Sequence, residues 1–297
     1  MDKEDVNNNL AKKNKSLSRI KNIILVASGK GGVGKSMVAT NLALSLSKLG
    51  LDIGLLDADI YGPSIPIMFG IKDDNNIRIM PNSNKDNVIM LPIIKYSIKL
   101  MSIGFLISSS SPVIWRGPML VSAFIQMMNQ VLWGDLDYLI IDLPPGTGDI
   151  QLTISQKISV SGSIIVSTPQ DLALADVLRA KLMFEKVNVR ILGIIENMSF
   201  FICDKCNKKH EIFVRQSDKV YKNWNVELLG SIPLNSIISQ TSDQGMPYVF
   251  QYENNISKIF CNLTKRLNQI INESVKKEIY KYKAYCKTED KSKLPVI

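Results

Sequence analysis

A glycine-rich segment that ends in a lysine and a serine has the residue types and spacing that surround a bound phosphate group. It matches the pattern G-x-x-x-x-G-K-[ST] and lies between a short apolar run and a helical pattern. Phosphate oxygens meet several backbone N–H groups only where side chains are small, and the start of the next helix attracts the same anion. A glycine-rich turn without a ligand is the alternative, but it would not require the Lys-Ser ending. The segment predicts an ATP site formed by Gly29, Lys30, Gly31, Gly32, Val33, Gly34, Lys35 and Ser36.

Three side chains of this segment have predicted chemical roles. Lys35 would place its ammonium between the β- and γ-phosphates, and the Ser36 hydroxyl would complete the ligand shell of Mg²⁺. Lys30 is a second lysine inside the loop, which the general pattern does not require. A lysine that faces solvent is the alternative to a catalytic role for Lys30.

Three aspartates follow two other apolar runs, at the positions where α/β sheets bind ligands. Asp57 and Asp59 lie two residues apart, so an extended chain sends both side chains in similar directions. Asp142 ends the apolar run 138–141 in a Walker B-like segment, which makes it a candidate Mg²⁺ ligand. A buried strand end is a costly place for an unpaired carboxylate, so we interpret Asp142 as functional; a turn or a helix cap is the alternative for each acid.

Cys203 and Cys206 lie three residues apart after a further apolar run, 191–195, and can bind one metal centre together. Two ligands are too few for a stable zinc or iron–sulfur site. Two copies of the chain related by a twofold axis would supply the four thiolates of a [4Fe–4S] cluster. The alternatives are structural zinc with His210, the only histidine, as a third ligand, a redox-active dithiol, or no role.

The elements that position these residues are expected to alternate between short apolar strands and longer helices. We predict strands at residues 23–27, 53–56, 138–141, 163–166, 191–195 and 227–229. We predict helices near residues 35–49, 119–132, 172–186 and 256–283. This order indicates an α/β fold with a mostly parallel, doubly wound sheet, flanking helices and the architecture of P-loop NTPases. Residues 75–107 break the rhythm and are interpreted as an extension or hairpin at the sheet edge.

Composition and charge favour one globular domain with two polar ends. The chain has 297 residues, of which 45% are hydrophobic and 21% charged. We expect a disordered polar tail at residues 1–20, an ATPase domain at 21–274 and a basic tail at 275–297. Much of the net charge of +9 lies at the ends, where residues 1–22 hold six Lys or Arg against three acids and residues 275–297 hold seven against three. A nearly neutral domain does not favour specific binding to nucleic acid.

The hydropathy pattern predicts a cytoplasmic protein that is not embedded in a membrane. The first 19 residues are polar and lack the apolar region of a secretory signal. No stretch approaches the ~18 consecutive apolar residues that indicate a membrane span. The four cysteines do not resemble a disulfide framework, and Cys261 and Cys286 are interpreted as structural or exposed thiols.

Several segments, in this order, resemble one family of proteins. They read GKGGVGKS, LLDADIYGPSIP, WRGPM, DYLIIDLPPGTGD, STPQDLAL, ENMS followed by CxxC, and LLGSIPLN. Together they resemble the Mrp/ApbC iron–sulfur cluster carriers, which belong with MinD, ParA and nitrogenase iron protein to the P-loop ATPases that form dimers. The resemblance covers about residues 20–270. It implies a homodimeric ATPase that binds a labile cluster and exchanges it with scaffold proteins and apo-proteins.

The resemblance also implies roles for single residues. Lys30 would reach across the dimer interface to the partner's nucleotide and stabilise charge during hydrolysis. Asp57 would help to hold Mg²⁺ through water, and Asp59 would orient or deprotonate the attacking water. Asn197 would contact the edge of the adenine, and Pro233 would lie against the base.

This chain departs from the family pattern in three places, and other functions stay open. Only a polar tail precedes the phosphate loop, where family members often have a small domain. Residues 212–217 replace a glycine-rich stretch, and the tail from Val275 has no match. A positioning ATPase of the MinD or ParA type would share the loop and Lys30, but it would give the cysteine pair no role. A metabolic kinase would need an acceptor pocket, for which no residues are apparent.

Overall fold

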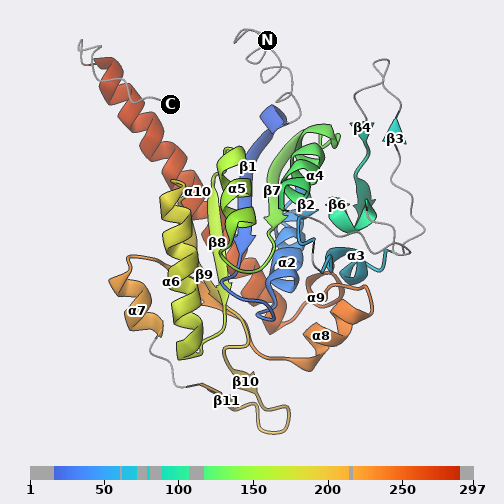
Figure 1. Cartoon of the computed structure of the whole chain (residues 1–297). Helices are drawn as coiled ribbons and strands as arrows, with labels where there is room; N and C mark the ends of the chain where they lie inside the picture. Colours follow the sequence, from blue (N-terminus) through green and yellow to red (C-terminus); the bar gives the residue numbers. More distant parts are fainter. Residues whose placement is uncertain are drawn as a thin grey trace, which may run out of the picture.

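An eight-stranded sheet forms the centre of the protein (Figure 1). The computed structural model describes residues 17–60, 62–71, 79–80, 89–106, 117–213 and 217–287. The strand order is β12-β9-β8-β1-β7-β2-β6-β5, and all neighbours are parallel except β6 and β5. In chain order the strands are β1 (Ile20–Ala27), β2 (Ile53–Asp57), β5 (Ile93–Lys95), β6 (Ile98–Ser102), β7 (Leu136–Asp142), β8 (Gly162–Ser167), β9 (Ile191–Glu196) and β12 (Leu228–Ser231).

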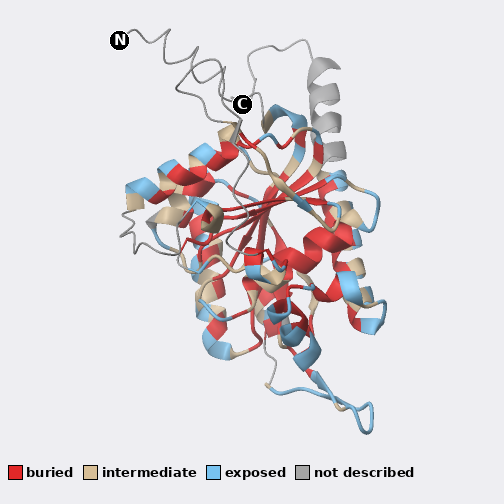
Figure 2. Ribbon diagram, turned by 90° about the vertical axis from the view of Figure 1, so that its right-hand side faces the viewer, coloured by how far each residue is buried: buried red, intermediate tan, exposed pale blue. Residues whose placement is uncertain are grey.

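Helices cover both faces of the sheet because its strands are apolar on both sides. In β1, Ile24 and Val26 pack with one group of helices, whereas Ile23 and Leu25 pack with the other, and Figure 2 shows the buried layer between them. The first group is α2 (Lys35–Ser47), α3 (Ile65–Met68), α8 (Ser236–Asp243), α9 (Tyr248–Gln251) and α10 (Asn255–Lys287). The second group is α4 (Gly117–Gln130), α5 (Asp149–Lys157), α6 (Asp171–Lys186) and α7 (Ser217–Asn223).

The remaining described elements are short. They are the 3₁₀ turns η1 (Leu17–Arg19) and η2 (Ile103–Phe105) and the strand pairs β3 (Ile79–Met80) with β4 (Ile89–Met90) and β10 (Phe201–Ile202) with β11 (Lys209–His210). None of the described helices combines the length and the apolar character that a membrane span requires.

The predicted fold class is confirmed, and each predicted strand and helix overlaps an observed one. The edge hairpin expected within residues 75–107 is β5–β6, but β6 also pairs in parallel with β2 and extends the main sheet. The helices α3, α7, α8 and α9 were not predicted. Helix α10 continues to Lys287, past the expected start of the basic tail, and the domain boundaries stay predictions.

The predicted site residues come from several loops at one edge of the sheet. The carboxyl ends of parallel strands meet at that edge, and the loops after β1, β2, β7, β9 and β12 all begin there. In Figure 1 the β10–β11 hairpin extends beyond the body of the molecule at the same end.

Candidate functional site

The phosphate loop connects β1 to α2, as predicted, and its backbone needs glycine. Gly32 has φ 77° and Gly34 has φ 80°, which are left-handed conformations that glycine adopts at little cost. Gly34 also precedes the first turn of α2, and no side chain caps that turn. The N–H groups at the start of α2 thus have no side-chain acceptor at this cap, and such groups together with the helix dipole attract an anion.

Gly29 provides a sharp test of the loop's packing. A Cβ atom at Gly29 would lie 2.4 Å from the backbone oxygen of Asp176 in α6, whereas nothing lies within 4 Å of one at Gly31. We expect Gly29→Ala to lower the free energy of unfolding by about 3 kcal/mol and to weaken nucleotide binding, because backbone has to move. Gly31→Ala is the matched control for packing and should cost little stability, because its Cβ meets no atom. Urea unfolding measures both variants, and equal losses of stability would contradict this packing argument.

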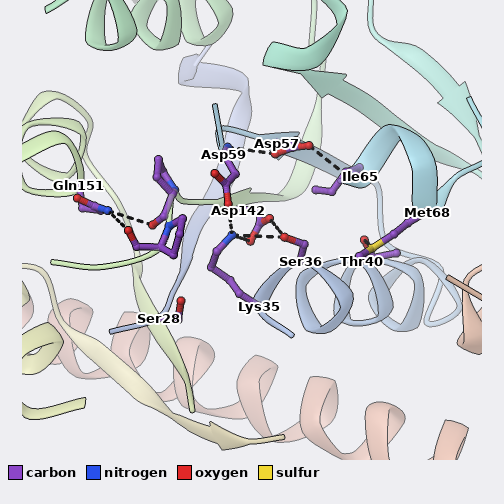
Figure 3. Close-up of polar contacts among 12 residues, drawn as sticks. Ser28, Lys35, Ser36, Thr40, Asp57, Asp59, Ile65, Met68, Asp142 and Gln151 are labelled. Carbon is purple, nitrogen blue, oxygen red and sulfur yellow. Dashed lines mark hydrogen bonds and ion pairs between the residues drawn. The ribbon is translucent and has the colours of Figure 1, made fainter. Parts of the chain in front are cut away.

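Lys35 and Ser36 both contact Asp142 (Figure 3). The Lys35 side chain is buried, and its Nζ lies 2.7 Å from Asp142 Oδ1 and 3.4 Å from Asp59 Oδ2. The Ser36 hydroxyl donates to the other oxygen of Asp142. The structure therefore brings together the lysine, the serine and two of the predicted acids. It aims the Lys35 ammonium at these two acids.

Asp57 is fully buried beside Asp142, because β2 and β7 pair with these two residues in register. Its carboxylate accepts hydrogen bonds from the backbone N–H groups of Asp59 and Ile65, at 3.1 and 3.2 Å, and from the Ser102 hydroxyl at 3.1 Å. Burial raises the pKa of Asp57 to about 8, and the charge of Asp142 adds to this rise. The pKa of Asp142 is also raised by burial, against the opposing charge of Lys35.

The carboxylate oxygens of Asp57, Asp59 and Asp142 suit a Mg²⁺ ion that binds together with a nucleotide better than one held by the protein alone. Among the described residues, no three His, Cys, Asp or Glu side chains are placed to hold a metal ion together. Mg²⁺ usually takes one or two carboxylates and completes its shell with water and phosphate. Within the described part of the chain, Asp59 Oδ1 is buried without a hydrogen-bond partner. Such an oxygen is available to water or to a ligand.

Asn197 and Pro233 line one pocket of about 230 Å³ next to the phosphate loop. Asn197 is buried, and its Nδ2 donates to the backbone oxygen of Val33 at 2.8 Å. Met37, Met198 and Asp243 also line this pocket, and the sequence analysis did not identify them. Met198 lies in the quoted segment ENMS, but no role was assigned to it, and Met37 and Asp243 lie outside the quoted segments. A larger cavity, about 580 Å³, lies near the amino-terminal end of β1 and contains none of the predicted site residues.

Two further residues missed by the sequence analysis support the acidic centre. Ser102, the last residue of β6, donates to Asp57. Gln151 is buried in α5, and its Nε2 donates to the carbonyl oxygens of Pro144 and Pro145 at 3.2 and 2.6 Å, which holds the turn after Asp142 (Figure 3). Nothing in the local sequence distinguishes either residue from an ordinary polar side chain.

Lys30 lies apart from the other lysine of the loop. Its side chain is half-buried, and its Nζ is 3.5 Å from Gln170 Oε1, just before α6. No ion pair of Lys30 occurs among the described residues. The predicted role of Lys30 across a dimer interface stays a prediction.

Cys203 and Cys206 lie in the turn between β10 and β11, where Cys203 is half-buried and Cys206 is exposed. The backbone N–H groups of Cys206 and Lys205 point to the Cys203 sulfur and lower the pKa of this thiol. His210 pairs with Phe201 in the hairpin and forms no three-ligand group with the two cysteines. The described part of the chain thus does not supply the three-ligand zinc site considered from the sequence.

Some sequence expectations fall on residues that the structure describes in part or not at all. Of the segment 212–217 that lacks glycines, residues 214–216 lie outside the described residues, and Ile212 is exposed. Residues 1–16 of the polar tail predicted at 1–20, and residues 288–297 of the basic tail, also lie outside them. Cys261 is a half-buried free thiol on α10.

A phosphate loop between strand and helix, with aspartates from two adjacent parallel strands, defines a P-loop nucleotide-binding protein. The family described as ParA, NUBPL iron-transfer P-loop NTPase, matches residues 19–268, and this chain belongs to that family. A MinD protein from Pyrococcus horikoshii, solved with Mg-ADP, shares the fold with a TM-score of 0.61 and 21% identity over 84% of this chain and 96% of that chain.

Two relatives with higher identity are named as iron–sulfur proteins, and a third is a solved nucleotide-binding protein. An iron-sulfur cluster carrier protein from Aquifex aeolicus is 44% identical over 88% of this chain and 71% of its own. The mitochondrial iron-sulfur protein required for NADH dehydrogenase of Arabidopsis thaliana is 48% identical over 84% and 79%. A solved nucleotide-binding protein from Archaeoglobus fulgidus, in complex with ADP, is 36% identical with a TM-score of 0.70 over 84% and 96%.

Proposed function

We propose that this chain binds and hydrolyses ATP and that two copies carry a [4Fe–4S] cluster between them for delivery to apo-proteins. The observation that carries the proposal is the placement of two thiols in an exposed hairpin turn, at the same sheet edge as the phosphate loop and without a third ligand among the described residues. A cluster site that needs a second chain explains this incomplete ligand set.

The geometry supports ATP hydrolysis by the residues around Asp142. The phosphates would bind the loop N–H groups and draw the Lys35 ammonium away from the acids. Mg²⁺, held by Ser36, Asp142 and Asp57, would neutralise charge on the phosphate oxygens. Asp59, with its unpaired buried oxygen, would accept a hydrogen bond from the attacking water and orient it.

The pocket lined by Asn197 and Pro233 is the proposed site of the adenine. It opens beside Gly34, so a nucleotide whose phosphates lie in the loop can place its base there. The apolar walls, which include Met37, suit a flat aromatic ring. The ADP complex of the Archaeoglobus fulgidus relative supports nucleotide binding by this fold.

The cluster is cargo, and the hairpin is suited to hold it weakly. Peptide N–H groups directed at the Cys203 sulfur stabilise a thiolate, which is the form that binds iron. Exposure of Cys206 leaves the site open to an acceptor protein. We propose scaffold proteins as the source of the cluster, apo-proteins as its destination, and the cytoplasm as the place of exchange. Lys30 would reach the nucleotide of the partner subunit in the same dimer.

The proposal is tested by purifying the protein without oxygen, adding iron and sulfide, and measuring visible absorption and iron per dimer. We expect about four irons per dimer and loss of the cluster in both Cys203→Ala and Cys206→Ala. Cys261→Ala is the matched control, because this thiol lies on α10 away from the hairpin, and it should retain the cluster. Iron retention that does not depend on Cys203 and Cys206 would refute the carrier site.

The same samples distinguish the alternatives. Stoichiometric zinc with no iron would indicate a structural centre completed by another chain. Absence of both metals, with ATP hydrolysis stimulated by liposomes or DNA, would indicate a positioning ATPase. Cluster transfer to an apo-protein at equal rates with ATP, ADP and no nucleotide would show that hydrolysis and transfer are not coupled.

A further inference from the structure

The segment between β9 and the cysteine hairpin is attached to the phosphate loop through one buried side chain. Asn197 follows the last residue of β9, and its Nδ2 donates to the Val33 oxygen at 2.8 Å. A Cβ atom at Gly34 would lie only 2.3 Å from this same nitrogen. The amide of Asn197 therefore lies directly against the backbone of the loop, and a side chain at Gly34 would displace it.

This bond controls a peptide group that a phosphate would use. The Val33 carbonyl and the Gly34 N–H belong to one planar trans peptide, in which the C=O and N–H point in opposite directions. Fixing the carbonyl on Asn197 thus fixes the direction of the Gly34 N–H. That N–H lies at the start of α2, where anions bind. A phosphate that holds the N–H in turn holds the carbonyl against Asn197.

The same segment is the root of the cysteine hairpin. Asn197 is followed by Met198, which has the left-handed φ of 56°. Next, the Ser199 N–H donates to the Ile232 oxygen at 2.9 Å, and the Phe200 oxygen accepts from the Leu234 N–H at 2.7 Å. Strand β10 begins at the following residue and leads to Cys203. Leu234 also lines the pocket beside the loop, so one residue contacts both the root of the hairpin and the pocket.

We propose that Asn197 is a positioning residue that couples nucleotide binding in the phosphate loop to the order of the cysteine hairpin. This inference rests on the proposed function and adds a structural connection between the nucleotide site and the cysteine hairpin. Nucleotide tightens the bond between Asn197 and Val33, and this restricts residues 197–200 and the hairpin beyond them. Because coupling between two sites is reciprocal, a filled hairpin strengthens nucleotide binding by the same factor.

Hydrogen exchange of the hairpin in the cluster-free full chain tests this coupling. The amides of Cys203 and Asn207 bond to the oxygens of Lys208 and Cys203, at 3.1 and 2.8 Å, so peptides that span residues 199–211 report on hairpin order. With saturating AMPPNP and Mg²⁺ we expect their exchange to slow by about fivefold or more, the lower end of typical coupling between sites. Asn197→Asp keeps the size of the side chain but removes the hydrogen-bond donor. In this variant the hairpin amides should exchange at nearly the same rate with and without nucleotide.

Matched measurements keep the outcome decisive. Asn22→Asp removes a comparable bond, from Asn22 Nδ2 to the Asp137 oxygen at 3.1 Å, outside the pocket and should retain the response. Saturation and dimer fraction are measured in every sample, because dimerisation alone could protect the hairpin. If Asn197→Asp cannot be saturated, Met198→Gly replaces it, since glycine leaves the left-handed turn free to move while the Asn197 amide is retained; its response should shrink.

An unchanged hairpin in the saturated wild-type protein would overturn the inference. So would a full response in Asn197→Asp, or in Met198→Gly where that variant is needed. None of these readouts involves iron, so failure to bind a cluster would refute the proposed cargo and leave the coupling standing. Failure of the wild-type chain to bind nucleotide would refute the proposed function and the coupling together.

Discussion

Replacing Lys35 by methionine should lower kcat for ATP hydrolysis by roughly 10²–10³-fold, because it removes the positive charge closest to the acids of the site. The Lys35 side chain is buried, and its ammonium contacts Asp142 and Asp59 at 2.7 and 3.4 Å. A preorganised charge in such a place costs no reorganisation when phosphate charge develops. Steady-state kinetics with saturating Mg-ATP measure the loss.

The same substitution should also destabilise the protein in a pH-dependent way. Lys35 lowers the pKa of both Asp57 and Asp142 against the effect of their burial. Without Lys35 both acids keep their protons to higher pH. The resulting loss in the free energy of unfolding is expected to reach about 3 kcal/mol at pH 8 and to be smaller at pH 5. Lys48→Met is the matched control, since this exposed lysine pairs with Glu253 at 3.4 Å and with no other acid among the described residues. Normal hydrolysis in Lys35→Met would contradict the assignment of the site.

The nucleotide-free and Mg²⁺-free protein should lose stability as the pH rises from about 4 to about 8. The pKa of Asp57 is about 8 in the folded chain, against 3.8 for an unperturbed aspartate. Within that range the folded state holds a proton that the unfolded state has released, so the free energy of unfolding falls with pH, by at most about 1.4 kcal/mol per pH unit for one proton. Urea unfolding between pH 5 and pH 9 measures the slope.

Asp57→Asn should flatten this slope and abolish most hydrolysis. At pH 5 the variant is expected to be less stable than the wild type, because an amide cannot accept all three hydrogen bonds that reach Asp57. At pH 8 to 9 the difference should shrink or reverse, since the second charge beside Asp142 is gone. Asp137→Asn is the control: Lys21 lowers the pKa of Asp137, so its titration lies at lower pH. An equal slope in wild type and Asp57→Asn would refute this source of the pH dependence.

The sequence predicted those parts of the molecule whose cause is local. Small residues at fixed spacing predicted the phosphate loop, and runs of apolar residues predicted strands buried on both sides. β6 was not recognised as a strand of the main sheet because its pairing with β2 depends on the rest of the fold. The short helices α3, α8 and α9 have too few turns for a clear hydrophobic period.

Contacts between distant segments could not be predicted in the same way. Lys35 follows β1 and meets Asp142 because β1 and β7 pair in one register. Asn197 meets Val33 across 164 positions. His210 shows the opposite error. Its proximity in sequence suggested a third metal ligand, but the ladder of β10 and β11 places it opposite Phe201.

The helix that begins at the phosphate loop is covered by segments made much later in synthesis. Asn41 of α2 accepts a hydrogen bond from the Val249 N–H across 208 positions, and Phe260 and Leu263 of α10 pack in the same core as Leu42. At about 5–20 residues per second, a ribosome needs roughly 10–40 s to make that stretch. During this interval the apolar side of α2 has no α9 or α10 to cover it. We therefore expect the nascent chain to become competent for nucleotide only near the end of translation, with Leu42 exposed to chaperones until then.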